Sequence, residues 1–451
     1  MTDLQVSDLH VCFEGAVPAV IATAGADGTP NITYLSRVRF VDSERIALSN
    51  QFFSKTARNL AENPRASILV IDPHTYDEYR LTVVYERTDR RGPVFERLHT
   101  DVEALKALGG AASVFKLRAA DIYRVLHIES VPKRPLQGEP GDPPNVGEAS
   151  AAQLADLTAR LSRCADLDTL VSATVDGLAE LFGYQHSVLL LLDEMGTKLY
   201  TIASRGYEEQ GVGSEVVVGE GIIGMAAARG APIRLGNLRQ MVKYGQTVVR
   251  RSSADDPSAI RDIPVPILPK VQSRVAVPAL ALGQLVGVLV VESEQLVAFD
   301  ANDEALLTIV ASVVANAIEA ERTRAQTTVA SGETAARAPA PVSSAATHVR
   351  FYTADGSTFL DGDYLIKGVA GRILWCLLRQ YEDEGRSDFS NREVRLDPSL
   401  ELPEFRDNFE SRLILLKRRL DERDSPVRIE KTGRGRFRVV VESALRLESV
   451  D

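Results

Sequence analysis

The fold expected of the C-terminal part of the chain is decided by residues 408–441, NFESRLILLKRRLDERDSPVRIEKTGRGRFRVVV. Its first half predicts a helix with one buried face, because large apolar residues recur at helical spacing: Phe409, Leu413, Leu416 and Leu420. The basic residues of this half are then predicted to lie largely on the other side of the helix: Arg412, Lys417, Arg418 and Arg419. The second half predicts two strands, 427–430 and 437–441, joined by a basic tip in which Gly433 and Gly435 allow a tight hairpin.

A helix followed by a basic hairpin is the outline of a winged helix, whose helix enters the major groove of DNA and whose hairpin lies on the phosphates. From about Val349 the chain resembles the OmpR-type winged-helix output domain, most closely in the segments 416–420 (LKRRL) and 429–438 (IEKTGRGRFR). The resemblance implies DNA contacts by basic residues of the helix and the wing: Arg412, Lys417, Arg418, Arg419, Lys431, Arg434 and Arg436.

The segment 398–403 departs from that family, because its prolines interrupt the place where a second helix should run straight into the turn. Four acidic residues also do not favour phosphate contact: Glu382, Asp383, Glu384 and Asp388. The alternative is a small α+β module with a solvated basic face.

The length of the chain, 451 residues, is too great for one hydrophobic core and predicts two to four domains. The formal net charge of −10 means that any contact with nucleic acid must be local. The three cysteines, Cys12, Cys164 and Cys376, lie far apart without the spacing of a metal site, which indicates a reducing compartment. We therefore expect neither a metal site nor a disulfide framework.

The beginning of the chain is acidic and is not typical of a signal peptide. The longest uncharged run, 275–291, is interrupted by Pro278 and by Gly283, which favours a buried hairpin over a membrane span. We expect a cytoplasmic protein without a membrane segment.

Two stretches are predicted to be linkers. Residues 132–150 are rich in proline, glycine and charge, and residues 327–347 are mostly alanine, serine, threonine and proline. They leave three globular parts, 1–131, 151–326 and 348–446, and the expected fold class is multidomain α+β.

The first part is mainly β, with a hairpin signal at residues 25–30 and a short helix that Ser54 could cap and that is expected to end just before Pro64. The order of its elements resembles the pyridoxamine-phosphate-oxidase-like split barrel, a family that binds flavin at a dimer interface. The most telling motif is SKTARNL, residues 54–60, placed before Asn63 and Pro64.

The resemblance implies that Lys55 and Thr56 hold the phosphate of FMN, and a helix start with a hydroxyl and a cation suits an anion. The other residues implied for the cofactor site are those of the same motif and of the strand after the hairpin: Ser54, Asn59, Thr33, Tyr34 and Ser36. Members of this fold also bind deazaflavin or haem, or bind nothing. The alternative is that Ser54 only caps the helix and Lys55 is solvated.

The middle part resembles a GAF domain, a sensory module whose small-molecule ligand lies over its sheet. The motifs are residues 219–227, 232–237 and 276–291. The glycines of the first motif are equally explained by a tight strand-to-helix turn. An insertion, 239–272, lies where such domains cover their pocket, and His186 is either a ligand contact or a core residue.

The last helix of the middle part, 302–324, carries a stripe wider than one sheet face needs: Leu306, Ile309, Val310, Val313, Val314, Ala317 and Ile318. Such a stripe pairs helices in a dimer or packs on the domain's own sheet. With the split barrel's usual paired interface, it leads us to expect a homodimer.

The leading hypothesis is a ligand- or redox-responsive transcription regulator, which senses through the first two domains and binds DNA through the third. Ligand binding must then favour one arrangement of the dimer differentially. The alternative is a flavin-dependent oxidoreductase regulated by the other domains. A third hypothesis is an interaction protein whose winged helix docks another protein.

Overall fold

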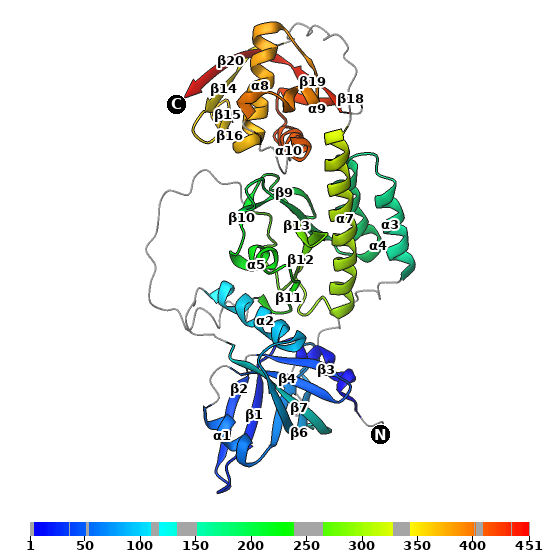
Figure 1. Ribbon diagram of the computed structural model, residues 1–451, viewed down its shortest axis with the longest axis vertical. Helices are drawn as coiled ribbons and strands as arrows, with labels where there is room; N and C mark the ends of the chain where they lie inside the picture. Colours follow the sequence, from blue (N-terminus) through cyan, green and yellow to red (C-terminus); the bar gives the residue numbers. More distant parts are fainter. Residues whose placement is uncertain are drawn as a thin grey trace.

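The computed structural model describes residues 4–35, 37–50, 54–109, 117–132, 151–238, 265–327, 343–400, 402, 409–433 and 435–450. These residues form three domains stacked end to end, with the N-terminal domain at one end and the C-terminal domain at the other (Figure 1). The predicted class, multidomain α+β, is confirmed. The expected linker 132–150 lies outside the described residues apart from Pro132.

The N-terminal domain is built on a barrel-like antiparallel sheet of order β2-β1-β5-β6-β7-β4-β3. Its strands are β1 Ala19–Ala24, β2 Pro30–Leu35, β3 Val38–Asp42, β4 Arg45–Asn50, β5 Arg65–Ile71, β6 Glu78–Asp89 and β7 Ala119–Ser130. Side chains of β1 and β5 alternate between buried and half-buried, because successive residues of a strand point to opposite faces. The hairpin predicted at residues 25–30 is confirmed by the pairing of Ala24 with Pro30.

Three helices accompany this sheet. A 3-10 helix, η1 (Val6–Phe13), packs into the core below the sheet, and the sequence pattern did not predict it. The expected helix α1 runs from Ser54 to Glu62 and ends before Pro64. Helix α2 (Pro93–Gly109) extends from this domain towards the middle domain, where Ala104 joins the apolar cluster of the middle sheet (Figure 1).

The middle domain starts with helices α3 (Ala151–Ser162) and α4 (Leu167–Phe182). Asp166 caps α4, accepting a hydrogen bond of 2.9 Å from the backbone N–H of Thr169, and Gly183 ends it in the left-handed conformation with φ 76°. The sheet that follows is antiparallel, of order β10-β9-β8-β13-β12-β11. Its strands are β8 His186–Leu192, β9 Lys198–Arg205, β10 Glu215–Val217, β11 Ile233–Leu235, β12 Ser273–Ala281 and β13 Gln284–Ser293.

Each face of the middle sheet has its own apolar cluster. Leu189 and Leu191 pack against α3, α4 and the long helix α7 (Ala301–Thr327). Leu190 and Val290 pack under the short helix α5 (Gly221–Arg229). The sheet is therefore covered on both faces, and the predicted hairpin of 275–291 forms its buried centre.

The stripe on α7 is mostly used within the chain. Leu306, Val310, Val314 and Ile318 are buried, whereas Ile309 is exposed. Residues 301–323 of α7 are long and apolar enough to cross a membrane, but half of this segment is buried as the core helix of the domain. The stripe thus no longer motivates a dimer, and the homodimer stays a prediction.

The C-terminal domain has two sheets, β16-β15-β14-β20 and β17-β19-β18. Its strands are β14 Ser343–Tyr352, β15 Thr358–Leu360, β16 Asp363–Ile366, β17 Asp388–Ser390, β18 Val427–Gly433, β19 Arg436–Val441 and β20 Ser443–Val450. Its helices are α8 Gly368–Glu384, α9 Asn391–Arg395, the 3-10 turn η2 Pro398–Leu400 and α10 Phe409–Glu422. The domain extends beyond the expected limits 348–446, because β20 pairs in parallel with β14 from Ser343 to Tyr352.

The helix and hairpin expected over 408–441 are present as α10, β18 and β19. The prediction that the basic residues of α10 lie on the side opposite its apolar face is wrong for Arg419, which turns into its own domain and is 6% exposed. Arg412 lies towards the middle domain, which covers it, so it is only 8% exposed. The middle domain covers α10 from the side opposite its own core, so the helix is surrounded.

Candidate functional site

The first candidate site is the start of α1, where the cofactor phosphate is expected. Thr56 and Asn59 are buried against the β1–β2 hairpin. The amide of Asn31 donates to the hydroxyl of Thr56 (3.0 Å), and the amide of Asn59 donates to the hydroxyl of Thr23 (3.1 Å). These bonds fix α1 on the hairpin, so Thr56 and Asn59 have a structural role that the motif did not reveal.

Thr33 and Tyr34 do not point to the same side of β2. Thr33 pairs with the buried Ile21, whereas Tyr34 pairs with Val20 on the outer face and is 75% exposed. Neighbouring residues of a strand alternate between faces, so the side chains of Thr33 and Tyr34 cannot meet a cofactor from the same surface. Their part in a flavin site stays a prediction. Ser36 and the side chain of Ser54 lie outside the described residues.

Lys55 and Arg58 are the exposed cations of this motif, and Lys55 lies in the first turn of α1. Hydrogen bonds from Thr29 hold the pKa of Asp27 below its ordinary value, and the charge of Lys55 adds to that effect, which places Lys55 near the hairpin tip. Lys55 and the N-terminal turn of α1 fit the phosphate of a flavin nucleotide.

The second candidate site is a buried polar cluster on the α5 side of the middle sheet. The guanidinium of Arg274 donates to Glu292 (Nε to Oε1, 2.6 Å), and the hydroxyl of Tyr207 donates to the same carboxylate at 3.2 Å. The backbone N–H of Leu268 is a third donor, at 3.0 Å. Burial and the charge of Glu292 raise the pKa of Tyr207. The ring of His186 meets Tyr207 edge to face, so His186 borders this cluster.

Sequence reasoning missed Arg274, Glu292 and Tyr207. The sequence did contain a signal for them, because the apolar run 275–291 is flanked by two charged residues, Arg274 and Glu292. The glycines of 219–227 serve the turn before α5, since a Cβ on Gly224 would lie 2.1 Å from the carbonyl oxygen of Val217.

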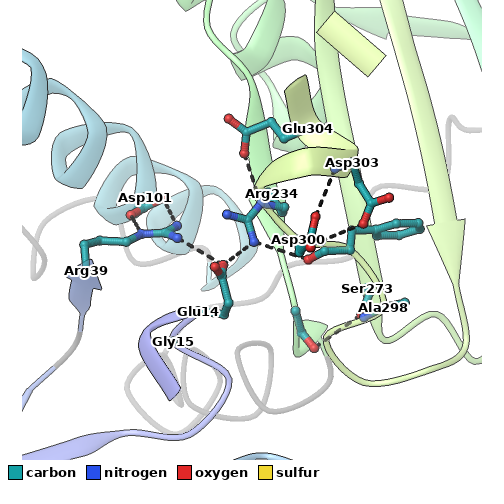
Figure 2. A network of polar contacts seen from close by, with 12 residues as sticks. Glu14, Gly15, Arg39, Asp101, Arg234, Ser273, Ala298, Asp300, Asp303 and Glu304 are labelled. Atoms are coloured by element: carbon teal, nitrogen blue, oxygen red, sulfur yellow. Dashed lines mark hydrogen bonds and ion pairs between the residues drawn. The ribbon is translucent and has the colours of Figure 1, made fainter. Parts of the chain in front are cut away.

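The junction between the N-terminal and middle domains is a network of buried charges. Arg39 holds Asp101 with two hydrogen bonds, of 2.6 and 2.7 Å, and also contacts Glu14 at 3.1 Å. Figure 2 shows the guanidinium of Arg234, from β11, between the carboxylates of Glu14 and Glu304. Burial alone would raise the pKa of Asp101, but the charge of Arg39 outweighs it and holds that pKa below its ordinary value.

The junction between the middle and C-terminal domains involves the residues expected to bind DNA. Arg412 holds Glu194 with hydrogen bonds of 2.8 and 2.7 Å, and its guanidinium lies 3.8 Å from the centre of the Tyr200 ring. Glu194 lies in the turn between β8 and β9, and Tyr200 lies on β9. Arg412 is therefore paired inside the protein rather than presented to solvent.

Asp168, in the first turn of α4, forms ion pairs with two further cations of α10. Arg418 donates to Oδ1 at 2.7 Å and Lys417 donates to Oδ2 at 3.1 Å. Arg418 also donates to the hydroxyl of Ser172 (2.7 Å) and to the carbonyl of Ile202 (3.1 Å). Burial alone would raise the pKa of Asp168, but Arg418 and Lys417 hold it below its ordinary value.

The other residues predicted to contact DNA have different surroundings. Lys431, on the hairpin, pairs with Asp166 of the middle domain. Arg419 turns into its own domain, where it donates to the carbonyl of Leu365 at 3.0 Å and to Glu422 at 2.7 Å. Arg436 is exposed on β19, and Arg434 lies outside the described residues.

Two family models match the chain. The model described as "Pyridoxamine 5'-phosphate oxidase" matches residues 9–126, and the model described as "GAF domain" matches residues 164–319. A curated relative, "Uncharacterized protein MJ0282" of Methanocaldococcus jannaschii, is 34% identical over 50 residues, which cover 11% of this chain. The chain spans about a third of the length of that relative, 34%.

Solved structures are similar to parts of the chain at low identity. The GAF domain of an Acinetobacter phosphoenolpyruvate-protein phosphotransferase is 19% identical, covers 38% of this chain and 93% of its own, and gives a TM-score of 0.32. The free methionine-R-sulfoxide reductase of Neisseria meningitidis, solved with its substrate, is 22% identical, with coverages of 39% and 96% and a TM-score of 0.30. An FMN-binding protein of Syntrophomonas wolfei is 16% identical, with coverages of 28% and 87% and a TM-score of 0.24. The two family models establish that the chain contains a domain of the pyridoxamine 5'-phosphate oxidase type followed by a GAF domain.

Proposed function

We propose that the chain is a ligand- or redox-responsive transcription regulator, in which the C-terminal domain is a winged helix that binds DNA. The observation that carries the proposal is the helix α10 next to the hairpin β18–β19, with cations on both elements of an otherwise acidic chain. A helix in the major groove and a hairpin on the phosphates use this order of elements. The proposal places the protein in the cytoplasm.

The sensory role rests on the first two domains. GAF domains take a small molecule over the sheet, and the polar cluster of Arg274, Glu292 and Tyr207 lies on the covered face of this sheet. That face is formed by strands β8 and β9 among others, and their connecting turn carries Glu194, the partner of Arg412. A ligand that shifts these strands would thus act on a residue in contact with α10.

The DNA-binding test uses the whole chain and a library of sheared genomic fragments. We expect enrichment of specific fragments, with an affinity that falls steeply with salt. The wing variant Arg434→Ala/Arg436→Ala should weaken binding to all fragments and flatten the log–log salt slope by about one unit per lost phosphate contact. Its matched control is Arg80→Ala/Arg87→Ala, which removes the same charge from exposed arginines of the N-terminal domain.

The contacts of α10 with the middle domain could keep the unmodified chain from binding DNA. The selection is therefore repeated with Asp168→Lys/Glu194→Lys, which replaces two carboxylates in contact with α10 by cations. Absence of enrichment with both proteins would overturn DNA binding. An unaltered salt slope in the wing variant would overturn the winged-helix assignment.

The second candidate function is a flavin-dependent oxidoreductase, favoured by the match to the oxidase-type family and by the exposed Lys55 at the start of α1. A bound flavin would supply the redox chemistry, and this chain would hold its phosphate. Lys55→Ala should reduce flavin retention several-fold by removing a charge-assisted bond, whereas Arg65→Ala, an exposed cation on β5, should not. The measurement is the absorbance spectrum and mass spectrum of the purified protein, and equal retention in both variants would place the phosphate elsewhere.

A further inference from the structure

The inference concerns how the C-terminal domain is controlled, and it rests on the proposed DNA binding. Four of the cations predicted to meet DNA, three on α10 and one on the adjoining strand β18, are engaged by carboxylates of the GAF domain. Arg412 pairs with Glu194, Lys417 and Arg418 pair with Asp168, and Lys431 pairs with Asp166. For α10, Figure 1 shows the helix at the end of its domain that faces the GAF domain.

We propose that the acidic end of the GAF domain is an internal binding site for α10 that competes with DNA for the same cations, so that the chain described here is closed to DNA. A carboxylate takes a guanidinium in the bidentate manner that a phosphate also uses. Arg412 makes such a pair with Glu194. The GAF carboxylates therefore stand where phosphates of the duplex would have to lie.

The competition is also steric. Nε, Nη1 and Nη2 of Arg418 all donate to GAF atoms, which are Asp168, Ser172 and the carbonyl of Ile202. The guanidinium of Arg412 is stacked on Tyr200 and buried. A duplex cannot approach these groups until the GAF domain has moved away, because both partners need the same side of the helix.

The acidic end of the GAF domain has further carboxylates besides Asp168 and Glu194, which bind α10. Glu215 of β10 contacts Lys367, the residue before α8, at 3.2 Å. The GAF face therefore matches the charge of the C-terminal domain from α4 through the β8–β9 turn to β10. One apolar cluster also runs without a break from the GAF helices into the C-terminal domain, joining Leu170 and Leu416 among its members. Charge and apolar contact thus act together to hold the closed arrangement.

Release from this site would control DNA affinity. If the open form makes up about 1–10% of the molecules, the observed affinity for DNA is lower than that of the open form by about 10- to 100-fold. A GAF ligand that favours the open form would raise the affinity by up to that factor.

The test compares the whole chain with its release variant Asp168→Lys/Glu194→Lys, on the genomic fragments selected in the DNA-binding experiment. We expect at least about tenfold tighter binding by the release variant. The matched control is Glu208→Lys/Glu209→Lys, which makes the same change of charge at exposed GAF residues. The control should bind like the unmodified chain, because added charge alone does not open the junction.

Hydrogen exchange of α10, measured without DNA, provides a second readout and should be faster in the release variant only. If the release variant and the unmodified chain bind DNA equally and protect α10 equally, the internal site is overturned while DNA binding stands. If neither protein binds DNA, the proposed function fails, and the inference fails with it.

Discussion

The GAF domain makes two charged junctions, and they differ in how far water reaches them. At the junction with the N-terminal domain, Arg234 lies between Glu14 and Glu304 with its side chain 4% exposed. At the junction with the C-terminal domain, the pair of Arg412 and Glu194 is also buried, with side chains 10% and 9% exposed. Asp168, in contrast, binds Lys417 and Arg418 with its side chain 32% exposed. Salt and protons weaken an ion pair that water reaches much more than a buried one.

The comparison shows which junction suits a switch. Removing one partner from a fully buried network leaves another charge without compensation, so the first junction is held strongly. At the second junction the partly exposed pairs of Asp168 make small contributions. A ligand that favours release must mainly overcome the buried pair of Arg412 and Glu194 and the shared apolar contact. We therefore expect the N-terminal and GAF domains to act as one unit and the C-terminal domain to be released.

The largest expected effect is at the buried junction. Arg234→Met should lower the free energy of unfolding by about 3 kcal/mol, because Glu14 and Glu304 lose a shared cation in a buried place. The measurement is urea denaturation followed by circular dichroism. The control Arg160→Met breaks the exposed pair with Glu180 and should cost less than about 1 kcal/mol. Equal losses in the two variants would contradict the comparison.

A smaller effect is expected from salt. Raising the ionic strength from 0.1 to 1 M shortens the screening length from about 10 to about 3 Å. Hydrogen exchange in α10 should become several-fold faster, whereas exchange in α2, beside the buried network, should change little. Similar acceleration in both helices would mean that the two junctions are equally accessible.

The smallest effect is expected from pH, and it has a definite sign. The pKa of Asp168 is held below its ordinary value of 3.8 when α10 is docked, so its contribution is complete above about pH 4. The contribution is lost as the pH falls through the docked pKa. Small-angle scattering should therefore show a constant radius of gyration from pH 7 to 5 and an increase only below about pH 4. Asp168→Asn should remove that acid-dependent step, whereas a step unchanged in this variant would assign it to another group.

Local patterns predicted much of the fold. The hairpin at residues 25–30 and the short helix α1 before Pro64 depend on neighbours in the sequence, and both were predicted. The helix and hairpin of 408–441 were predicted for the same reason. The strand β20 was not, because its pairing partner β14 lies far away along the chain.

The candidate sites were predicted less well, since they depend on distant partners. The sequence around Arg412 does not predict its partner Glu194, which is 218 residues earlier in the chain. The case of Thr33 and Tyr34 is different, because the alternation along a strand alone predicts that neighbouring side chains face opposite sides. A family motif names residue types, but the register of the strand decides which of them share a surface.

The parallel pairing of β20 with β14 has a consequence for synthesis on the ribosome. The first strand of the C-terminal domain must wait for a partner that is made about a hundred residues later, which takes roughly 5–20 s at ordinary elongation rates. The helices and sheet of the GAF domain precede that whole interval in the chain. The acidic end of the GAF domain can therefore fold before α10 is complete. A newly synthesised chain would then leave the ribosome with α10 already docked on the GAF domain.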